Sequence, residues 1–302
     1  MKVSLVNLAN NHVMDHGAAG LKNTLDVCHR EGIGCVGGGN DVTAASQLWF
    51  CERNGVRLAV LSCAEHEFGM ATPARAGANP LDLVRIVRGI REQRKNFDRL
   101  VILLHGGNEY CPYPRPSLAE LCRFLVEQGA DAVICQHSHC IGCWENHQGG
   151  IIVHGQGNFI FDDPKARPCE KEGLLLSLEV SHDQPLAMRM IFFKQAAGRP
   201  GIEPMSEAEE ARARQLLDER NARLQDAGFL EREWVNFCSG KRRAYLGIVH
   251  GFGRRLRNLD TRFGVLSPFF SKRHALMMLH MLRCESHREL MEQVLSDETK
   301  AQ

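Results

Sequence analysis

Histidine and asparagine side chains that could bind a metal follow three apolar segments of this sequence. Asn11 follows the first segment and His105 ends the second. His137 and His139, one residue apart, follow the third. Imidazole suits zinc, iron, nickel and copper, and also manganese where oxygen ligands share the site. Because strand ends lie side by side within one sheet, these groups are expected to converge on a metal-assisted active site.

Acid–base chemistry is predicted beside these ligands. The unperturbed pKa of histidine lies near neutrality, so His12 could protonate the leaving oxygen of a metal-bound phosphate. Asp15 is close enough in sequence to orient His12. Two glycines follow His105, where a metal or substrate could approach the backbone closely. His137 and His139 can face one region only if the backbone between them is irregular.

Each of these features alone is more typical of an ordinary polar residue at the rim of a sheet. Their joint occurrence at three predicted strand ends favours a metal site. Cys140 and Cys143 form a CxxC pair, which could join His137 and His139 in a zinc module. Without a second CxxC, two plain thiols are the favoured interpretation.

Composition indicates an ordinary globular protein. The chain has 302 residues, 44% of them hydrophobic and 24% charged, which fits one large domain or two smaller ones. A net charge of +1 gives no argument for nucleic acid. No apolar run reaches the length of a membrane span, and no secretory signal is expected. The twelve cysteines fall mostly in apolar stretches, which indicates reduced thiols and a cytoplasmic location.

The expected elements alternate early and become strands late. Apolar patterns predict strands at 2–9, 34–36, 57–63, 99–104, 131–135, 150–153, 174–180 and 186–193. Helices are predicted at 17–31, from Pro80 onward, and from a Ser117 cap, with Glu120 as its capping partner, to Gln128. The order predicts parallel strands with an antiparallel finish, in a mixed, layered α/β architecture.

Composition changes near residue 199, so we expect a domain over 1–198 and a helical extension over 199–302. Helices are predicted at 206–227, 241–259 and 272–296. Lysine and arginine concentrate at 241–243 and 254–257, where a solvated helix surface is favoured over a patch for a polymer or a membrane.

Four segments, in order, resemble motifs of CapA-type capsule-synthesis proteins. Residues 8–17, LANNHVMDHG, are similar to the family's LANNHxxDxG. Residues 105–110, HGGNEY, resemble HWGxEY, and 129–139, GADAVICQHSH, resemble GADxVIGHHPH. Residues 155–162, GQGNFIFD, are similar to SLGNFxFD. The helical tail lies outside this resemblance.

The resemblance implies a four-layer α/β/β/α sandwich of the calcineurin-like metallophosphoesterase superfamily, with a two-metal centre. It implies that Asn11, His105 and His137 bind one metal and His139 the other. His12 would be the acid, with Glu109 near the same mouth. Residues expected beside the ligands are Asn10, Asn158 and Asp162, of which the last two could equally be turn formers.

The chain departs from the family pattern at its start. In the family, a strand with a Gly-Asp motif and a further acidic position precede the Asn-His motif, and here neither is found. We therefore expect at most one well-bound divalent ion, whether manganese, iron or zinc, because adjacent dications without bridging carboxylates repel strongly.

The implied function is metal-dependent phosphoester hydrolysis in the synthesis of a poly-γ-glutamate or exopolysaccharide capsule. The alternative is a non-catalytic accessory subunit that binds a capsule polymer or a synthase. Expected partners are a phosphate ester or capsule polymer and synthase components, without nucleic acid or a transmembrane segment. The location would be cytoplasmic or peripheral to a membrane.

Overall fold

The computed structural model describes residues 3–161, 167–196, 199–266 and 271–300. The chain forms two compact units, residues 1–233 and 234–302. All the motifs with candidate chemistry belong to the first unit.

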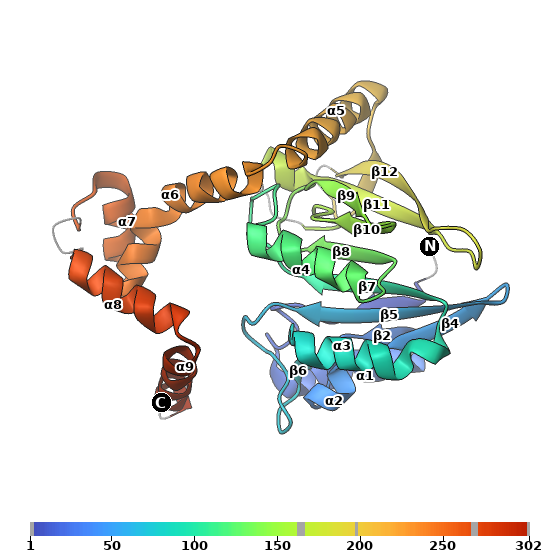
Figure 1. Cartoon of the computed structure of the whole chain (residues 1–302), viewed down its shortest axis with the longest axis horizontal. Coiled ribbons are helices and arrows are strands. Elements are labelled where there is room, and N and C mark those ends of the chain that lie inside the picture. The colour runs from blue at the N-terminus through green and yellow to red at the C-terminus, as the bar shows by residue number, and fades with distance from the viewer. Residues whose placement is uncertain (1–2, 162–166, 197–198, 267–270, 301–302) are drawn as a thin grey trace. The chain divides into compact units, whose positions relative to one another are not determined.

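A six-stranded sheet forms the centre of the first unit (Figure 1). Its strands, in spatial order, are β4 (Trp49–Arg53), β5 (Val56–Ala64), β7 (Arg99–His105), β8 (Ala132–Gln136), β10 (Gly150–Val153) and β9 (Trp144–His147). The four inner strands are parallel, and the two edge strands are antiparallel to their neighbours. Parallel strands are covered on both faces, which explains why β5, β7 and β8 are continuous apolar runs.

Helices α3 (Leu83–Gln93) and α4 (Pro116–Glu127) cover one face of this sheet (Figure 1). Their apolar stripes, including Ile90 and Leu125, pack against the alternate residues of the strands, such as Ile102. The predicted helix starts were wrong in detail. The side chain of Asp82 caps α3, and α4 begins at Pro116 without a side-chain cap, so Ser117 lies inside the helix.

The opposite face carries an antiparallel sheet of β11 (Glu172–Glu179), β12 (Ala187–Gln195) and β13 (Ile202–Pro204). Leu176 and Leu178 of β11 pack against Ile134 and Ile151 of the central sheet. The parallel pair β1 (Leu5–Asn7) and β2 (Gly34–Val36) contacts the central sheet through β5. The predicted mixed, layered α/β fold with C-terminal helices is therefore confirmed.

Shorter elements connect these layers. Helix α1 (Gly17–Arg30), predicted at 17–31, lies where the sequence pattern placed it and contacts β2. The elements missed by the sequence patterns include the edge strands β4 and β9, and the shortest pieces. These are β3 (Gly38–Gly39), α2 (Val42–Ala45), β6 (Gly77–Ala78), η1 (Arg94–Asn96) and η2 (Pro168–Lys171).

The first unit extends past the domain boundary that was expected at residue 198. Strand β13 pairs with β12, and helix α5 (Glu207–Leu224) buries Ala213 and Leu217 against Leu174 and Phe192. Residues 202–224 therefore complete the core of the first unit, because they cover apolar side chains of the three-stranded sheet.

The second unit is helical, with most of α6 (Phe229–Val249), then α7 (Arg254–Phe263), α8 (Lys272–Arg283) and α9 (Glu285–Lys300). Both long helices predicted here are interrupted. The chain turns at Gly251, where φ is +72°, and Cys284 adopts an extended conformation between α8 and α9. Across the described residues, every helix is too short or too polar to span a membrane.

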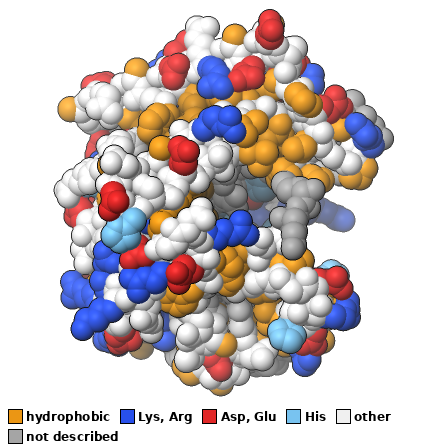
Figure 2. All heavy atoms as spheres, turned by 90° about the vertical axis from the view of Figure 1, so that its right-hand side faces the viewer, with side chains coloured by type: hydrophobic (Ala, Val, Ile, Leu, Met, Phe, Trp, Pro, Cys, Tyr) orange, Lys and Arg blue, Asp and Glu red, His pale blue; other side chains and the backbone are white. Residues whose placement is uncertain are grey.

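Charges of both signs are interspersed on the surface shown in Figure 2, with hydrophobic side chains gathered in the upper half of the view. This mixture agrees with the net charge of +1. A surface without a single-sign field offers no electrostatic footprint for a polyanion on that face.

Candidate metal-binding site

Three of the predicted ligands meet at the carboxyl ends of their strands. The Nε2 atom of His105 lies 3.1 Å from Oδ1 of Asn11 and 2.8 Å from Nδ1 of His137. The two imidazole rings are edge to face, with centroids 4.6 Å apart. Residues 94 and 32 positions apart in the chain are thus direct neighbours, because β7 and β8 end at the same edge of the sheet.

Glu67 joins this cluster and was not predicted. Its Oε2 atom accepts a hydrogen bond of 2.8 Å from the side-chain amide of Asn11, and its Oε1 atom lies 3.4 Å from Nε2 of His137. A signal was present in the sequence, because Glu67 comes three residues after a buried strand, β5, just as the histidines follow theirs. The site therefore includes a carboxylate, where the sequence had indicated only neutral ligands.

Glu65, which also follows β5, contacts the loop after β7 at the same edge of the sheet. Its carboxylate forms an ion pair with Arg115 and accepts a hydrogen bond of 3.2 Å from the backbone N–H of Gly107. A Cβ atom on Gly106 would lie 2.9 Å from Cδ of Glu65. Gly106 thus makes room for the side chain of Glu65, and not for a metal or substrate as its sequence context predicts.

An irregular backbone turns both histidines of the HxH pair toward the site. His137 has a φ of +122° and His139 a φ of +55°, values that non-glycine residues adopt at a cost. Their ring centroids are 5.9 Å apart. The condition set by the sequence pattern, an irregular loop at this point, is therefore met.

Asn158 holds the ring of His139. Its Oδ1 atom lies 2.9 Å from Nδ1 of His139, while its Nδ2 donates to the backbone carbonyl of Glu170 at 3.1 Å. Asn158 is 9% exposed, so this contact is shielded from water. Asp162, predicted at the same place, lies outside the described residues.

His12 stands at the exposed side of the cluster. Its Nδ1 atom lies 2.9 Å from Oδ2 of Asp15, and its backbone N–H donates to Oδ1 of Asn10 at 2.9 Å. Asp15 thus orients the ring, and Asn10 shapes the turn that carries it. Glu109 is exposed, and no described residue forms a hydrogen bond or ion pair with it.

Burial tunes the chemistry of His105. Desolvation, together with the neighbouring His137, His139 and His12, lowers the pKa of His105 to about 4. The ring is therefore neutral at physiological pH and keeps a nitrogen lone pair for a metal. The amide of Asn11, the imidazoles of His105 and His137 and the carboxylate of Glu67 together make up a mixed nitrogen and oxygen set, which suits manganese, iron or zinc.

A hollow of about 310 Å³ opens beside these ligands. It lies between the ends of β7 and β8 and the start of β11, and Phe159 and Phe193 are among its apolar walls. Its lining includes His105, His137, His139 and Asn158. A small polar ligand could therefore reach the imidazoles against an apolar wall.

The CxxC pair does not contribute to this cluster. Cys140 and Cys143 are buried, and burial raises the pKa of Cys140 to about 11. In the part of the chain that the structure describes, neither thiol belongs to a group of three candidate ligands close enough to share an ion. The structure thus gives the zinc-module interpretation no support.

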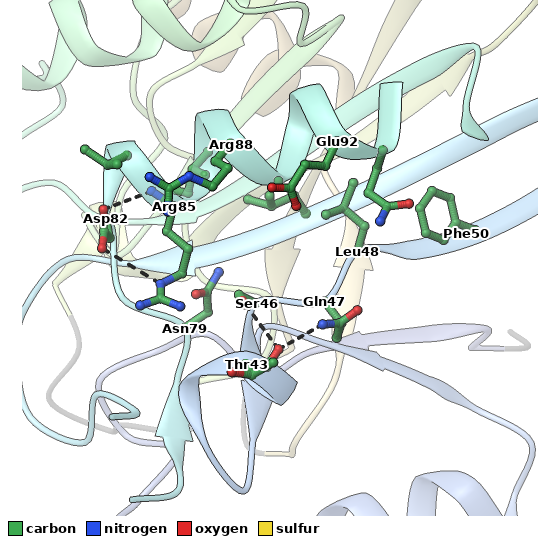
Figure 3. Close-up of a pocket in the computed structure, with 15 residues that line it drawn as sticks. Thr43, Ser46, Gln47, Leu48, Phe50, Asn79, Asp82, Arg85, Arg88 and Glu92 are labelled. Atoms are coloured by element: carbon green, nitrogen blue, oxygen red, sulfur yellow. Dashed lines mark hydrogen bonds and ion pairs between the residues drawn. The ribbon is translucent and has the colours of Figure 1, made fainter. Parts of the chain in front are cut away.

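Another hollow, of about 370 Å³, lies between α2 and α3 (Figure 3). Thr43 of α2 lies on one side of it, and Asp82, the cap of α3, lies on the other side with Arg85, Arg88 and Glu92 of that helix. None of the predicted ligands lines this hollow. The imidazole cluster at the sheet edge is therefore the better candidate for metal chemistry.

Comparison with known proteins agrees with the motif pattern. The family model described as bacterial capsule synthesis protein PGA_cap matches residues 1–163. The capsule biosynthesis protein CapA of Bacillus anthracis is 32% identical over 165 residues, which cover 53% of this chain and 40% of that protein. The PGA biosynthesis protein CapA of Bacillus subtilis is also 32% identical over 165 residues, covering 54% and 43%.

Among solved structures, the NAD nucleotidase of Haemophilus influenzae aligns with a TM-score of 0.39 and 11% identity, over 71% of this chain and 41% of that one. The chain spans less than half the length of the two Bacillus relatives. The family match nevertheless covers more than half of the 302 residues and includes Asn11, His105, His137 and His139. The chain therefore belongs to the bacterial capsule synthesis protein PGA_cap family.

Proposed function

We propose that the first unit carries a metal-dependent phosphoesterase site that acts in the synthesis of a poly-γ-glutamate or related capsule. The observation that carries the proposal is the convergence of Asn11, His105, His137 and Glu67 at one sheet edge. The names of the Bacillus relatives support the capsule context.

One divalent ion is the proposed occupant of this ligand set. The side chains meet in pairs in the structure, and among the described residues no three histidine or carboxylate groups at the rim bring ligand atoms within 4.8 Å of one another, so binding would draw them closer. Asn11 offers Oδ1, His105 offers a neutral Nε2, and His137 and Glu67 complete a mixed set next to them. When bound, such an ion would polarise a phosphoryl oxygen and lower the pKa of a bound water. His139, held by Asn158, faces the same hollow and is available to a second ion or to the phosphate.

His12 would act as the proton donor. Asp15 holds its Nδ1 atom, which leaves Nε2 directed away from that contact and available to a leaving-group oxygen. A histidine in this role contributes a factor of roughly 10²–10⁴ to the rate. Its exposure places it where an extended substrate could still reach it.

A non-catalytic accessory role is the second candidate. It is favoured by the single carboxylate, Glu67, that contacts the ligands among the described residues. In that role the hollow beside His139 would bind a capsule polymer or a synthase segment. A cytoplasmic location is proposed for either role, because the cysteines fall mostly in apolar stretches of the sequence, as reduced thiols do.

Hydrolysis of a generic diester, bis-p-nitrophenyl phosphate, tests the proposal. The chain is stripped with a chelator and then supplied with Mn²⁺, Fe²⁺ or Zn²⁺. We expect metal-dependent turnover that His137→Ala abolishes. His12→Ala should lower turnover about 100-fold for a diester with an alkoxide leaving group and much less for the p-nitrophenyl diester, whose leaving group needs little protonation. The matched control is His147→Ala, because His147 pairs with Glu127 away from the site and should leave turnover unchanged.

Binding of one ion without turnover by any of the three metals would contradict the catalytic proposal and favour the accessory role. Equal turnover in wild type and His137→Ala would show that the activity does not come from the cluster that contains His137. A direct metal-binding measurement by calorimetry separates these two results.

A further inference from the structure

A second group of potential metal ligands lies inside the first unit, on the helix-covered face of the central sheet. It consists of Cys122 in α4, Cys135 in β8 and His154 directly after β10. All three are buried, with at most 4% of each exposed. One ligand atom from each lies within 4.8 Å of the others, and the two sulfur atoms are 3.6 Å apart.

The fold brings these three side chains together across two strands and a helix. Strands β8 and β10 are parallel, with Ile134 paired to Val153, so the next residues along, Cys135 and His154, are neighbours on one face. Helix α4 packs against that face, so the sulfur atom of Cys122 contacts that of Cys135. The imidazole cluster at the rim is separate, because it lies beyond the strand ends.

His154 is oriented as metal-binding histidines are. Its Nε2 atom lies 3.1 Å from Oε1 of Glu145, and the other carboxylate oxygen of Glu145 accepts a hydrogen bond of 2.7 Å from Arg123. The Nδ1 atom of His154 is fully buried and makes no hydrogen bond of regular geometry to another described residue, while the thiol of Cys135 lies close to the ring. A carboxylate on one ring nitrogen directs the other toward a metal as a lone pair.

We infer that Cys122, Cys135 and His154 form a buried zinc-binding site. Zinc–sulfur bonds of about 2.3 Å in a tetrahedron separate two sulfur ligands by roughly 3.8 Å, close to the distance seen here. A disulfide would need the sulfurs at about 2.05 Å. The Nδ1 atom of His154 supplies the third ligand, and the fourth position is left to a small ligand such as water.

Charge balance selects zinc over copper(I). Two cysteine thiolates neutralise a divalent ion, and Arg123 neutralises Glu145, so the buried group carries no net charge. A monovalent ion would leave one uncompensated negative charge in the core, which is costly. Bound zinc would link α4, β8 and the residue that follows β10. Cys135, one of its ligands, lies two residues before His137, so the ion would also help to fix the strained backbone of His137.

Cobalt(II) substitution in the full chain tests this site independently of hydrolysis. The reduced, metal-free protein is titrated with cobalt(II), and thiolate-to-cobalt charge transfer is followed in the near ultraviolet. The rim cluster contains no thiol, so only the buried site yields this band. We expect one equivalent to saturate it in a His105→Ala, His137→Ala background, which disables the rim and removes its competition for the ion.

The variants Cys122→Ala and Cys135→Ala should each lose the band, while Cys63→Ala should keep it. Cys63 is the matched control, since it is equally buried in the same core but outside the group of three. X-ray absorption of the zinc-loaded wild type, which needs no variant, should report sulfur ligands to zinc, two for each ion at the buried site. Absence of both signals in folded, reduced wild type would overturn the inference, as would a band that persists without Cys122 and Cys135.

Discussion

At the scale of single residues, the contact between His139 and Asn158 can be tested by removing its acceptor. Asn158→Ala should lower metal affinity or turnover roughly 10- to 100-fold, because ligand-orienting partners have effects of this size. Asn158→Asp retains an acceptor oxygen for Nδ1 of His139 but loses the donor to the carbonyl of Glu170, so it should recover only part of the loss. Calorimetric titration with the metal measures the affinity of the wild type and of both variants. Equal affinities would refute a positioning role for Asn158.

The close approach of Glu65 to Gly106 yields a prediction about stability. Gly106→Ala places a Cβ atom 2.9 Å from Cδ of Glu65 and should destabilise the protein by about 1–3 kcal/mol. Gly89→Ala is the matched control, because Gly89 lies within α3 and a Cβ there meets nothing within 4 Å. That change should stabilise by about 0.5–1 kcal/mol in urea unfolding. Destabilisation by both would point to a general intolerance of alanine.

At the scale of elements, the start of α5 is fixed by a capping box. Ser206 accepts from the N–H of Glu209, and Glu209 accepts from the backbone N–H of Ser206 at 2.8 Å. Glu209 also pairs with Lys194 of β12, which attaches the helix to the three-stranded sheet. Local sequence sufficed for the cap, since its partners are three residues apart.

This cap should make stability depend on pH in the acid range. Lys194, followed by the N–H and hydroxyl groups of Ser206, lowers the pKa of Glu209 to about 2 from its ordinary value of 4.5. The unfolded chain then binds the proton first, so the stabilisation is complete above pH 4.5 and is lost as pH falls toward 2. The thermal midpoint of Glu209→Gln should fall less steeply than that of wild type between pH 5 and pH 3. Parallel slopes would contradict the assignment.

At the scale of the whole molecule, the extent of the first unit leads to a prediction about truncation. A chain ending at residue 233 keeps β13 and α5, whereas one ending at 198 loses the residues that cover Leu174 and Phe192. The longer fragment should unfold cooperatively, and the shorter one should expose apolar surface and bind a hydrophobic dye such as ANS. Cooperative unfolding of the shorter fragment would restore the boundary expected at residue 198.

Local residue patterns were enough to predict that Asn11, His105 and His137 would meet, and to predict most of the elements that carry them. Asn11, His105 and His137 follow apolar segments that must become buried strands, and parallel strands end at a common edge. Ligand chemistry and strand position are both local properties, so they were accessible without a structure. The pattern of α1 and the cap of α5 were predictable for the same reason.

Only the tertiary structure decided which further side chains reach one another. Glu67 enters the cluster through the course of a loop, and His137 and His139 turn inward through positive φ angles that no residue pattern encodes. The meeting of Cys135 with His154 depends on the register of β8 and β10, and that of Cys122 on the packing of α4. Register and packing follow from burying the whole apolar surface at once, so a local pattern cannot specify them.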